Sequence, residues 1–91
     1  MRNELEVKLR QNTAEAMALQ SQISIIRQTQ QAHQKLLEGE EIRFSLGESS
    51  LFLINARETK LLEINEKLIE TENKLIKNTL KGEWLTGRFA D

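Results

Sequence analysis

The stretch Arg43-Phe44-Ser45-Leu46-Gly47-Glu48-Ser49-Ser50-Leu51 decides the fold, because it places a glycine and two serines between two long regions without proline. Glycine adopts the left-handed conformation that ends many helices, since it has no Cβ. Serine is a preferred N-cap residue, because its hydroxyl accepts a hydrogen bond from a free backbone N–H. The sequence therefore predicts that one helix ends at Gly47 and a second begins at Ser49 or Ser50. Such a short connection makes the two helices antiparallel neighbours.

Upstream of this turn, a heptad pattern predicts a helix over about residues 3–46. Its positions alternate four and three residues apart, as in a coiled coil; they are Leu5, Leu9, Asn12, Ala16, Leu19, Ile23, Ile26, Gln30, His33, Leu37, Glu40 and Phe44. Four of these are polar, so we expect a weaker contact than in a leucine zipper. For His33, a role in fixing the helix register is a better explanation than a metal ligand or a catalytic base, because no partner side chain is near it in the sequence.

Downstream, apolar residues predict a second helix over about residues 50–81. Two series repeat every seven residues; they are Ile54, Leu61, Leu68 and Leu75, and beside them Leu62, Ile69 and Ile76. Helix one carries a lighter second series of Ala18, Ile25 and Ala32. The two series of the second helix together form a wide apolar face, which predicts neighbouring helices on two sides.

The less regular tail, residues 82–91, completes a single hairpin domain over residues 1–91. Its Trp84 and Phe89 fit two roles equally well. They could anchor an interface, since aromatic residues dominate binding hot spots, or they could cap the open end of the hairpin.

Composition excludes several classes of protein. The chain has no proline, no cysteine and four glycines, so a β-rich fold with many turns and any thiolate metal site are excluded. A net charge of −1 gives no field that attracts nucleic acid. The longest apolar run, Leu51–Ile54, is far shorter than the ~20 residues of a membrane-spanning helix.

No enzymatic site is expected. Gly47-Glu48-Ser49-Ser50-Leu51 lacks the second glycine and the nearby base of a nucleophile elbow. The cluster of Glu38, Glu40 and Glu41 has no aspartate-rich loop of the calcium-binding kind, so a solvated face is the better interpretation. We expect no catalytic residue, no cofactor and no metal.

Residues 41–58 resemble the TolC-like outer membrane efflux protein family. That family carries an Arg-Phe pair, a glycine three residues later, a small hydroxyl residue and an apolar run. Here the matching residues are Arg43-Phe44, Gly47, Ser49-Ser50 and Leu51-Phe52-Leu53-Ile54, followed by Asn55 and Arg57-Glu58. The flanking heptads extend the resemblance over roughly residues 14–80.

The resemblance implies a homotrimeric channel of the outer membrane and periplasm that exports small molecules or ions. This chain would be one long hairpin of its periplasmic α-barrel, and the turn would be the periplasmic tip. There it would dock to a periplasmic adaptor, or membrane fusion protein, and so connect indirectly to an inner membrane pump. The residues that match the docking tip are Leu46, Gly47, Glu48 and Ser49, supported by Arg43, Phe44 and Ser50.

The sequence also departs from the family. Some drug-exporting members carry acidic residues six and nine positions after the tip glycine, where this chain has Leu53 and Ala56. An acidic, cation-selective gate is therefore not expected. The strands of the β-barrel and the first hairpin are missing, so we expect a fragment or a truncated gene.

Two other non-enzymatic interpretations remain open. The chain could be a free-standing coiled-coil adaptor or oligomerisation module that dimerises into a four-helix bundle. It could also be the hairpin of the periplasmic adaptor itself, although the adaptor's tip motif differs from Arg43-Phe44 with Gly47-Glu48-Ser49-Ser50.

Overall fold

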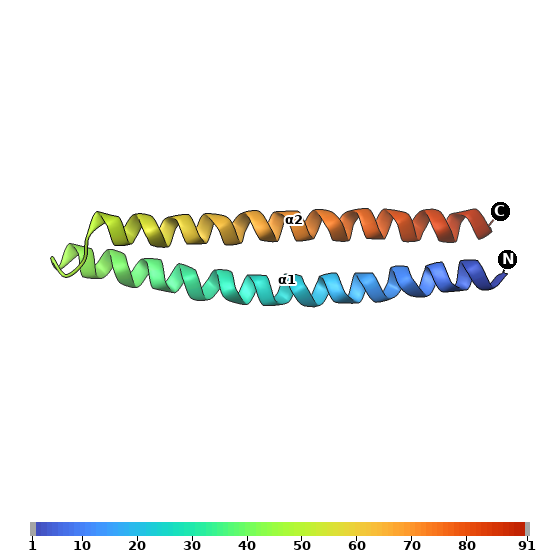
Figure 1. The fold of residues 1–91 in the computed structure, drawn as a ribbon, viewed down its shortest axis with the longest axis horizontal. Helices are drawn as coiled ribbons and strands as arrows, with labels where there is room; N and C mark the ends of the chain where they lie inside the picture. The colour runs from blue at the N-terminus through green and yellow to red at the C-terminus, as the bar shows by residue number, and fades with distance from the viewer. Residues whose placement is uncertain (1, 91) are drawn as a thin grey trace. The chain divides into compact units, whose positions relative to one another are not determined.

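The computed structural model describes residues 2–90, and the side chains of residues 4–87. Helix α1 spans Arg2–Ser45 and helix α2 spans Leu51–Ala90, joined by the turn at residues 46–50 (Figure 1). Over residues 2–90 there is no strand, so the predicted all-α helical hairpin is confirmed. Helix α2 extends beyond Lys81, and residues 82–90 of the expected irregular tail are helical.

Helix α1 ends in a Schellman motif around Gly47. The backbone N–H of Glu48 donates to the carbonyl oxygen of Arg43 at 2.8 Å, and that of Gly47 donates to Phe44 at 3.0 Å. Gly47 has a φ of 75°, which is unfavourable for any residue with a Cβ. The predicted glycine cap is therefore confirmed, and it satisfies carbonyl groups that the helix itself leaves free.

Helix α2 begins at Ser50 as its N-cap. The Ser50 hydroxyl oxygen accepts a hydrogen bond from the N–H of Leu53 at 3.3 Å. Its backbone carbonyl accepts the first helical bond, from Ile54, at 3.1 Å. Of the two serines proposed for this role, Ser50 rather than Ser49 performs it.

The chain divides into two compact units. Unit 1 combines residues up to Ile23 with residues from Glu70 onward, and unit 2 is the continuous segment Ser24–Ile69. Unit 2 contains the turn. Each unit takes a segment from both helices and has its own buried contact.

In unit 2 the core follows the predicted heptad positions of α1. Leu37 and Glu40 are buried together with Ile54 and Ile64 of α2. Other heptad residues are half-buried: Ile26, Gln30 and His33 on α1, and Arg57, Leu61 and Leu68 on α2. A polar contact is included, because the Gln30 amide donates to Asn65 Oδ1 at 2.5 Å.

In unit 1 the core contains a reciprocal amide pair. Asn12 Nδ2 donates to the backbone oxygen of Asn78 at 3.0 Å, and Asn78 Nδ2 donates to that of Asn12 at 3.2 Å. Gly82 permits this arrangement, because a Cβ there would lie 2.6 Å from Asn12 Oδ1. The other buried residues of unit 1 are Leu19, Ile23, Thr71 and Leu85.

The buried face of α2 differs in part from the expected wide stripe. The series Ile54, Leu61, Leu68 and Leu75 is buried or half-buried, as predicted. Its companion positions are Arg57, Ile64, Thr71, Asn78 and Leu85, each seven residues after the last. The second apolar series, Leu62, Ile69 and Ile76, is exposed, and it remains available for a neighbour outside the chain.

Candidate functional site: the turn end of unit 2

The turn end of unit 2 collects exposed apolar side chains. Six large apolar residues between positions 42 and 53 are exposed: Ile42, Phe44, Leu46, Leu51, Phe52 and Leu53. Leu46 is 68% exposed and Phe52 is 78% exposed. A concentration of apolar surface that water does not favour is typical of a protein-binding site. We call these six residues the apolar tip.

The predicted docking residues have different roles in this geometry. Leu46, Gly47 and Glu48 are exposed at the turn, as a docking role requires. Ser49 is half-buried, and its buried hydroxyl has no hydrogen-bond partner among the described residues. The hydroxyl of Ser50 is engaged in the N-cap. The Ser49 hydroxyl is therefore covered, and the Ser50 hydroxyl is bound within the turn.

The supporting residues Arg43 and Phe44 hold the turn through their backbone carbonyls. The Arg43 side chain is exposed and lies 3.9 Å from the buried carboxylate of Glu40. Phe44, expected as the last heptad position of α1, is exposed instead. The buried contact of unit 2 therefore ends at Glu40, and Phe44 becomes part of the apolar tip.

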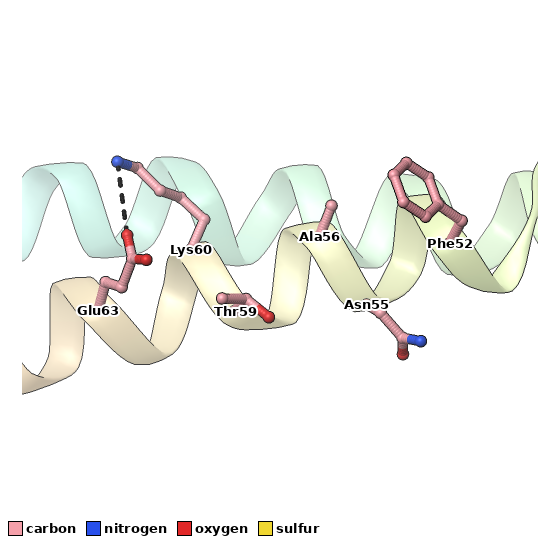
Figure 2. Close-up of a pocket in the computed structure, with 6 residues that line it drawn as sticks. All are labelled: Phe52, Asn55, Ala56, Thr59, Lys60 and Glu63. Atoms are coloured by element: carbon pink, nitrogen blue, oxygen red, sulfur yellow. Dashed lines mark ion pairs between the residues drawn. The ribbon is translucent and has the colours of Figure 1, made fainter.

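Behind the tip, a shallow groove of about 430 Å³ runs along one face of α2. Figure 2 shows Phe52, Ala56 and Lys60 rising on the same side of the helix, whereas Asn55 points the other way. An ion pair between Lys60 Nζ and Glu63 Oε2, at 3.9 Å, lies at the end of the groove away from Phe52 (Figure 2). The groove therefore continues the apolar surface of Phe52 along the helix.

Three further sequence positions can now be placed. Asn55 is exposed to solvent. His33 is half-buried, and its Nδ1 has no hydrogen-bond partner within the described residues. Trp84 is exposed, while the side chain of Phe89 lies outside the described residues.

Within residues 2–90, no three His, Cys, Asp or Glu side chains come together as metal ligands would. In the same part of the chain, neither helix has an apolar stretch long enough to cross a membrane. Comparisons of this chain with protein-family models, with curated proteins and with solved structures find no match. The geometry of the turn end is therefore the basis for a functional proposal.

Sequence reasoning identified the turn but not the full extent of its surface. It missed four residues of the apolar tip, namely Ile42, Leu51, Phe52 and Leu53. A signal was present, because all four are large and apolar at positions outside the buried heptad series. Apolar residues outside the buried series but next to a helix-ending glycine indicate an exposed patch.

Proposed function

We propose that this chain is the periplasmic tip hairpin of an outer membrane efflux channel, which docks to a periplasmic adaptor during export of small molecules or ions. The parent protein would be a homotrimer of the outer membrane and periplasm, connected through the adaptor to an inner membrane pump. The role is structural and non-enzymatic. The proposal rests on the resemblance of residues 41–58 to the TolC-like family and on the apolar tip.

The apolar tip is the observation that carries the proposal. Leu46 and Phe52 are the most exposed large apolar residues around the turn, and their surface is removed from water only when a partner covers it. Arg43 and Glu48 supply charged groups beside them. An apolar centre with a polar rim is the usual composition of a protein–protein interface.

The polar contacts of unit 2 support a conformational mechanism of opening. Gln30 and His33 occupy heptad positions where apolar residues would give a tighter contact. A helix pair with such positions shifts more easily than one with leucine at each of them. Adaptor binding at the tip would then stabilise an open arrangement of the helices and so open the channel.

The test is direct binding of the chain to the helical-hairpin domain of periplasmic adaptor proteins, measured by biolayer interferometry. Replacing Leu46 and Phe52 together by serine should weaken binding about tenfold or more, as for central apolar contacts. The matched control replaces Leu62 and Ile69 by serine, because these are also exposed but lie outside the tip. The control should bind as the wild-type chain does.

Two results would count against this function. One is adaptor binding that survives the loss of Leu46 and Phe52. The other is an equal loss in the control variant, which would show that exposed apolar residues act without regard to their position.

A further inference from the structure

Phe44 and Leu51 lie on either side of the turn, and both are exposed although they keep the spacing of a coiled coil. The series Glu40, Phe44, Gly47, Leu51 and Ile54 advances by four and three residues in alternation. Its first and last members are buried. Phe44 is 41% exposed and Leu51 is 62% exposed. The sequence across the turn therefore has the pattern of one continuous helix, which the hairpin does not use.

The register of the helix pair in unit 2 is symmetric about this turn. The Gln30 amide donates to Asn65 Oδ1, which fixes where α1 and α2 lie opposite each other. Two heptads from Gln30 toward the turn is Phe44, and two heptads from Asn65 toward the turn is Leu51. If α1 and α2 were joined into one helix, two antiparallel copies in this register would place Phe44 of each copy opposite Leu51 of the other.

Residues 46–50 can become helical without losing backbone hydrogen bonds. The segment contains no proline, so each residue has an N–H to donate. In the turn the N–H of Gly47 bonds to Phe44 and that of Glu48 bonds to Arg43. In a helix the same two donors would bond to Arg43 and Phe44 respectively. Gly47 also has no side chain, so at the middle of the series it lets two helices approach closely.

We propose that two copies of this chain exchange their α2 helices. In the exchanged dimer residues 46–50 are helical, and α1 of each copy packs against α2 of the other with the contacts that unit 1 and unit 2 have in the hairpin. Exchange of an identical element is a low-cost route to a dimer, because the contacts of the monomer are formed again between two chains. The contact is symmetric, so it closes at two copies and builds no filament.

Phe44 and Leu51 favour the dimer, whereas the turn favours the hairpin. Both side chains are exposed in the hairpin, and each would lie against its counterpart from the second copy, away from water. Gly47 adopts its φ of 75° without the strain that a Cβ would cause, so the hairpin prevails at low concentration. A second copy explains the spacing of Phe44 and Leu51, which a partner docked on the hairpin tip does not require.

Exchange does not rest on the proposed adaptor docking, and it is measured without an adaptor. The exchanged dimer has no turn, so it would lack the tip of the hairpin and could not dock through it. Exchange would therefore withdraw chains from docking as their concentration rises.

Förster transfer within one chain distinguishes exchange from other forms of association. The chain has no cysteine, so Gln28→Cys and Glu66→Cys supply two labelling sites, both exposed and both in unit 2. In one continuous helix the two sites would lie roughly 57 Å apart, whereas in the hairpin they lie on neighbouring helices. The labelled chain is refolded from urea in an excess of unlabelled chain. Transfer within the labelled copy should fall as the concentration of unlabelled chain rises.

A substitution on each side of the turn tests the proposed contact. Phe44→Ser combined with Leu51→Ser should weaken exchange about tenfold or more, because only the dimer covers these side chains. The matched control combines Leu62→Ser with Ile69→Ser, which are also exposed but lie outside the series. The control should exchange as the wild-type chain does.

A substitution of the turn glycine tests the opposing term. Gly47→Ala should strengthen exchange about a hundredfold or more, because alanine is unfavourable at a φ of 75° and favourable in a helix. Gly39→Ala is the control, since Gly39 lies within α1 in both forms. It should leave exchange unchanged.

Sedimentation velocity of the same samples measures the mass, and three results would overturn the proposal. Transfer could stay constant at every concentration of unlabelled chain, both in the wild-type chain and in Gly47→Ala. The mass could double while transfer stays constant, which would indicate hairpins packed side by side. The Leu62 and Ile69 control could weaken exchange as much as the Phe44 and Leu51 variant, which would remove the role of the spacing across the turn.

Discussion

Replacing Gly82 by alanine tests the amide pair of unit 1, because two effects of opposite sign compete at this position. Alanine in place of glycine within a helix stabilises it by about 1 kcal/mol. The new Cβ would, however, meet Asn12 Oδ1 at 2.6 Å. The Asn12 amide then has to shift, and we expect it to lose its 3.0 Å hydrogen bond to Asn78.

The stability lost with the hydrogen bond should exceed the stability gained from alanine in the helix. A hydrogen bond of this kind contributes about 1 kcal/mol, and a buried polar group left without a partner costs about 1–3 kcal/mol. We therefore expect Gly82→Ala to lower the free energy of unfolding by about 1 kcal/mol. Gly39→Ala is the matched control. No atom lies within 4 Å of its added Cβ, so it should raise the same quantity by up to about 1 kcal/mol.

The effect of Gly82→Ala on the free energy of unfolding should change sign when the Asn12 side chain is removed. In a chain that already carries Asn12→Ala, Gly82→Ala should stabilise by up to about 1 kcal/mol, which makes the coupling between the two sites about 2 kcal/mol. Urea unfolding followed by circular dichroism measures all four members of the cycle. If Gly82→Ala stabilised the wild-type chain as much as Gly39→Ala does, the close approach at Asn12 would make no contribution to the free energy of unfolding.

Three further predictions concern the turn and the core of unit 2. Ser50→Ala should lower the free energy of unfolding by about 1 kcal/mol through loss of the N-cap. Ser49→Ala should leave the free energy of unfolding unchanged or raise it, because the Ser49 hydroxyl is buried without a partner among the described residues. Urea unfolding measures both variants, and equal effects would contradict the assignment of Ser50 as the N-cap. Gly47→Ala should cost about 1–2 kcal/mol at a φ of 75°, and an unchanged midpoint would contradict the left-handed cap. Replacing Gln30 and His33 by leucine should raise the melting temperature of the chain and slow transport by the full-length parent protein. Unchanged transport would refute the proposed conformational mechanism of opening.

The sequence predicted the turn and the core of α1 because these depend on local chemistry. A glycine cap and a serine N-cap act within one helical turn of themselves, so the residues at 47 and 50 specify them without any distant partner. The α1 heptad positions from Leu5 to Glu40 are buried or half-buried as predicted, since their spacing alone places them on one face.

The rest depends on contacts between residues far apart in the chain. Asn78 and Gly82 look unsuited to a core until Asn12 lies opposite them, 66 residues away from Asn78. Thr71 is only 1% exposed, yet a threonine gives no sign of burial in a heptad count. Phe44 shows the converse error, because a large apolar residue in the correct register still becomes exposed where the helix ends.

The capping of the turn separates folding from recognition. The carbonyl oxygens of Arg43 and Phe44 and the hydroxyl of Ser50 are all occupied by bonds within the turn, so these groups shape the turn and do not take part in binding a partner. Leu46, Glu48 and Phe52 can then be exchanged during evolution, or in an engineered chain, while the hairpin keeps its shape. Substitutions at these positions therefore change the binding partner without changing the fold.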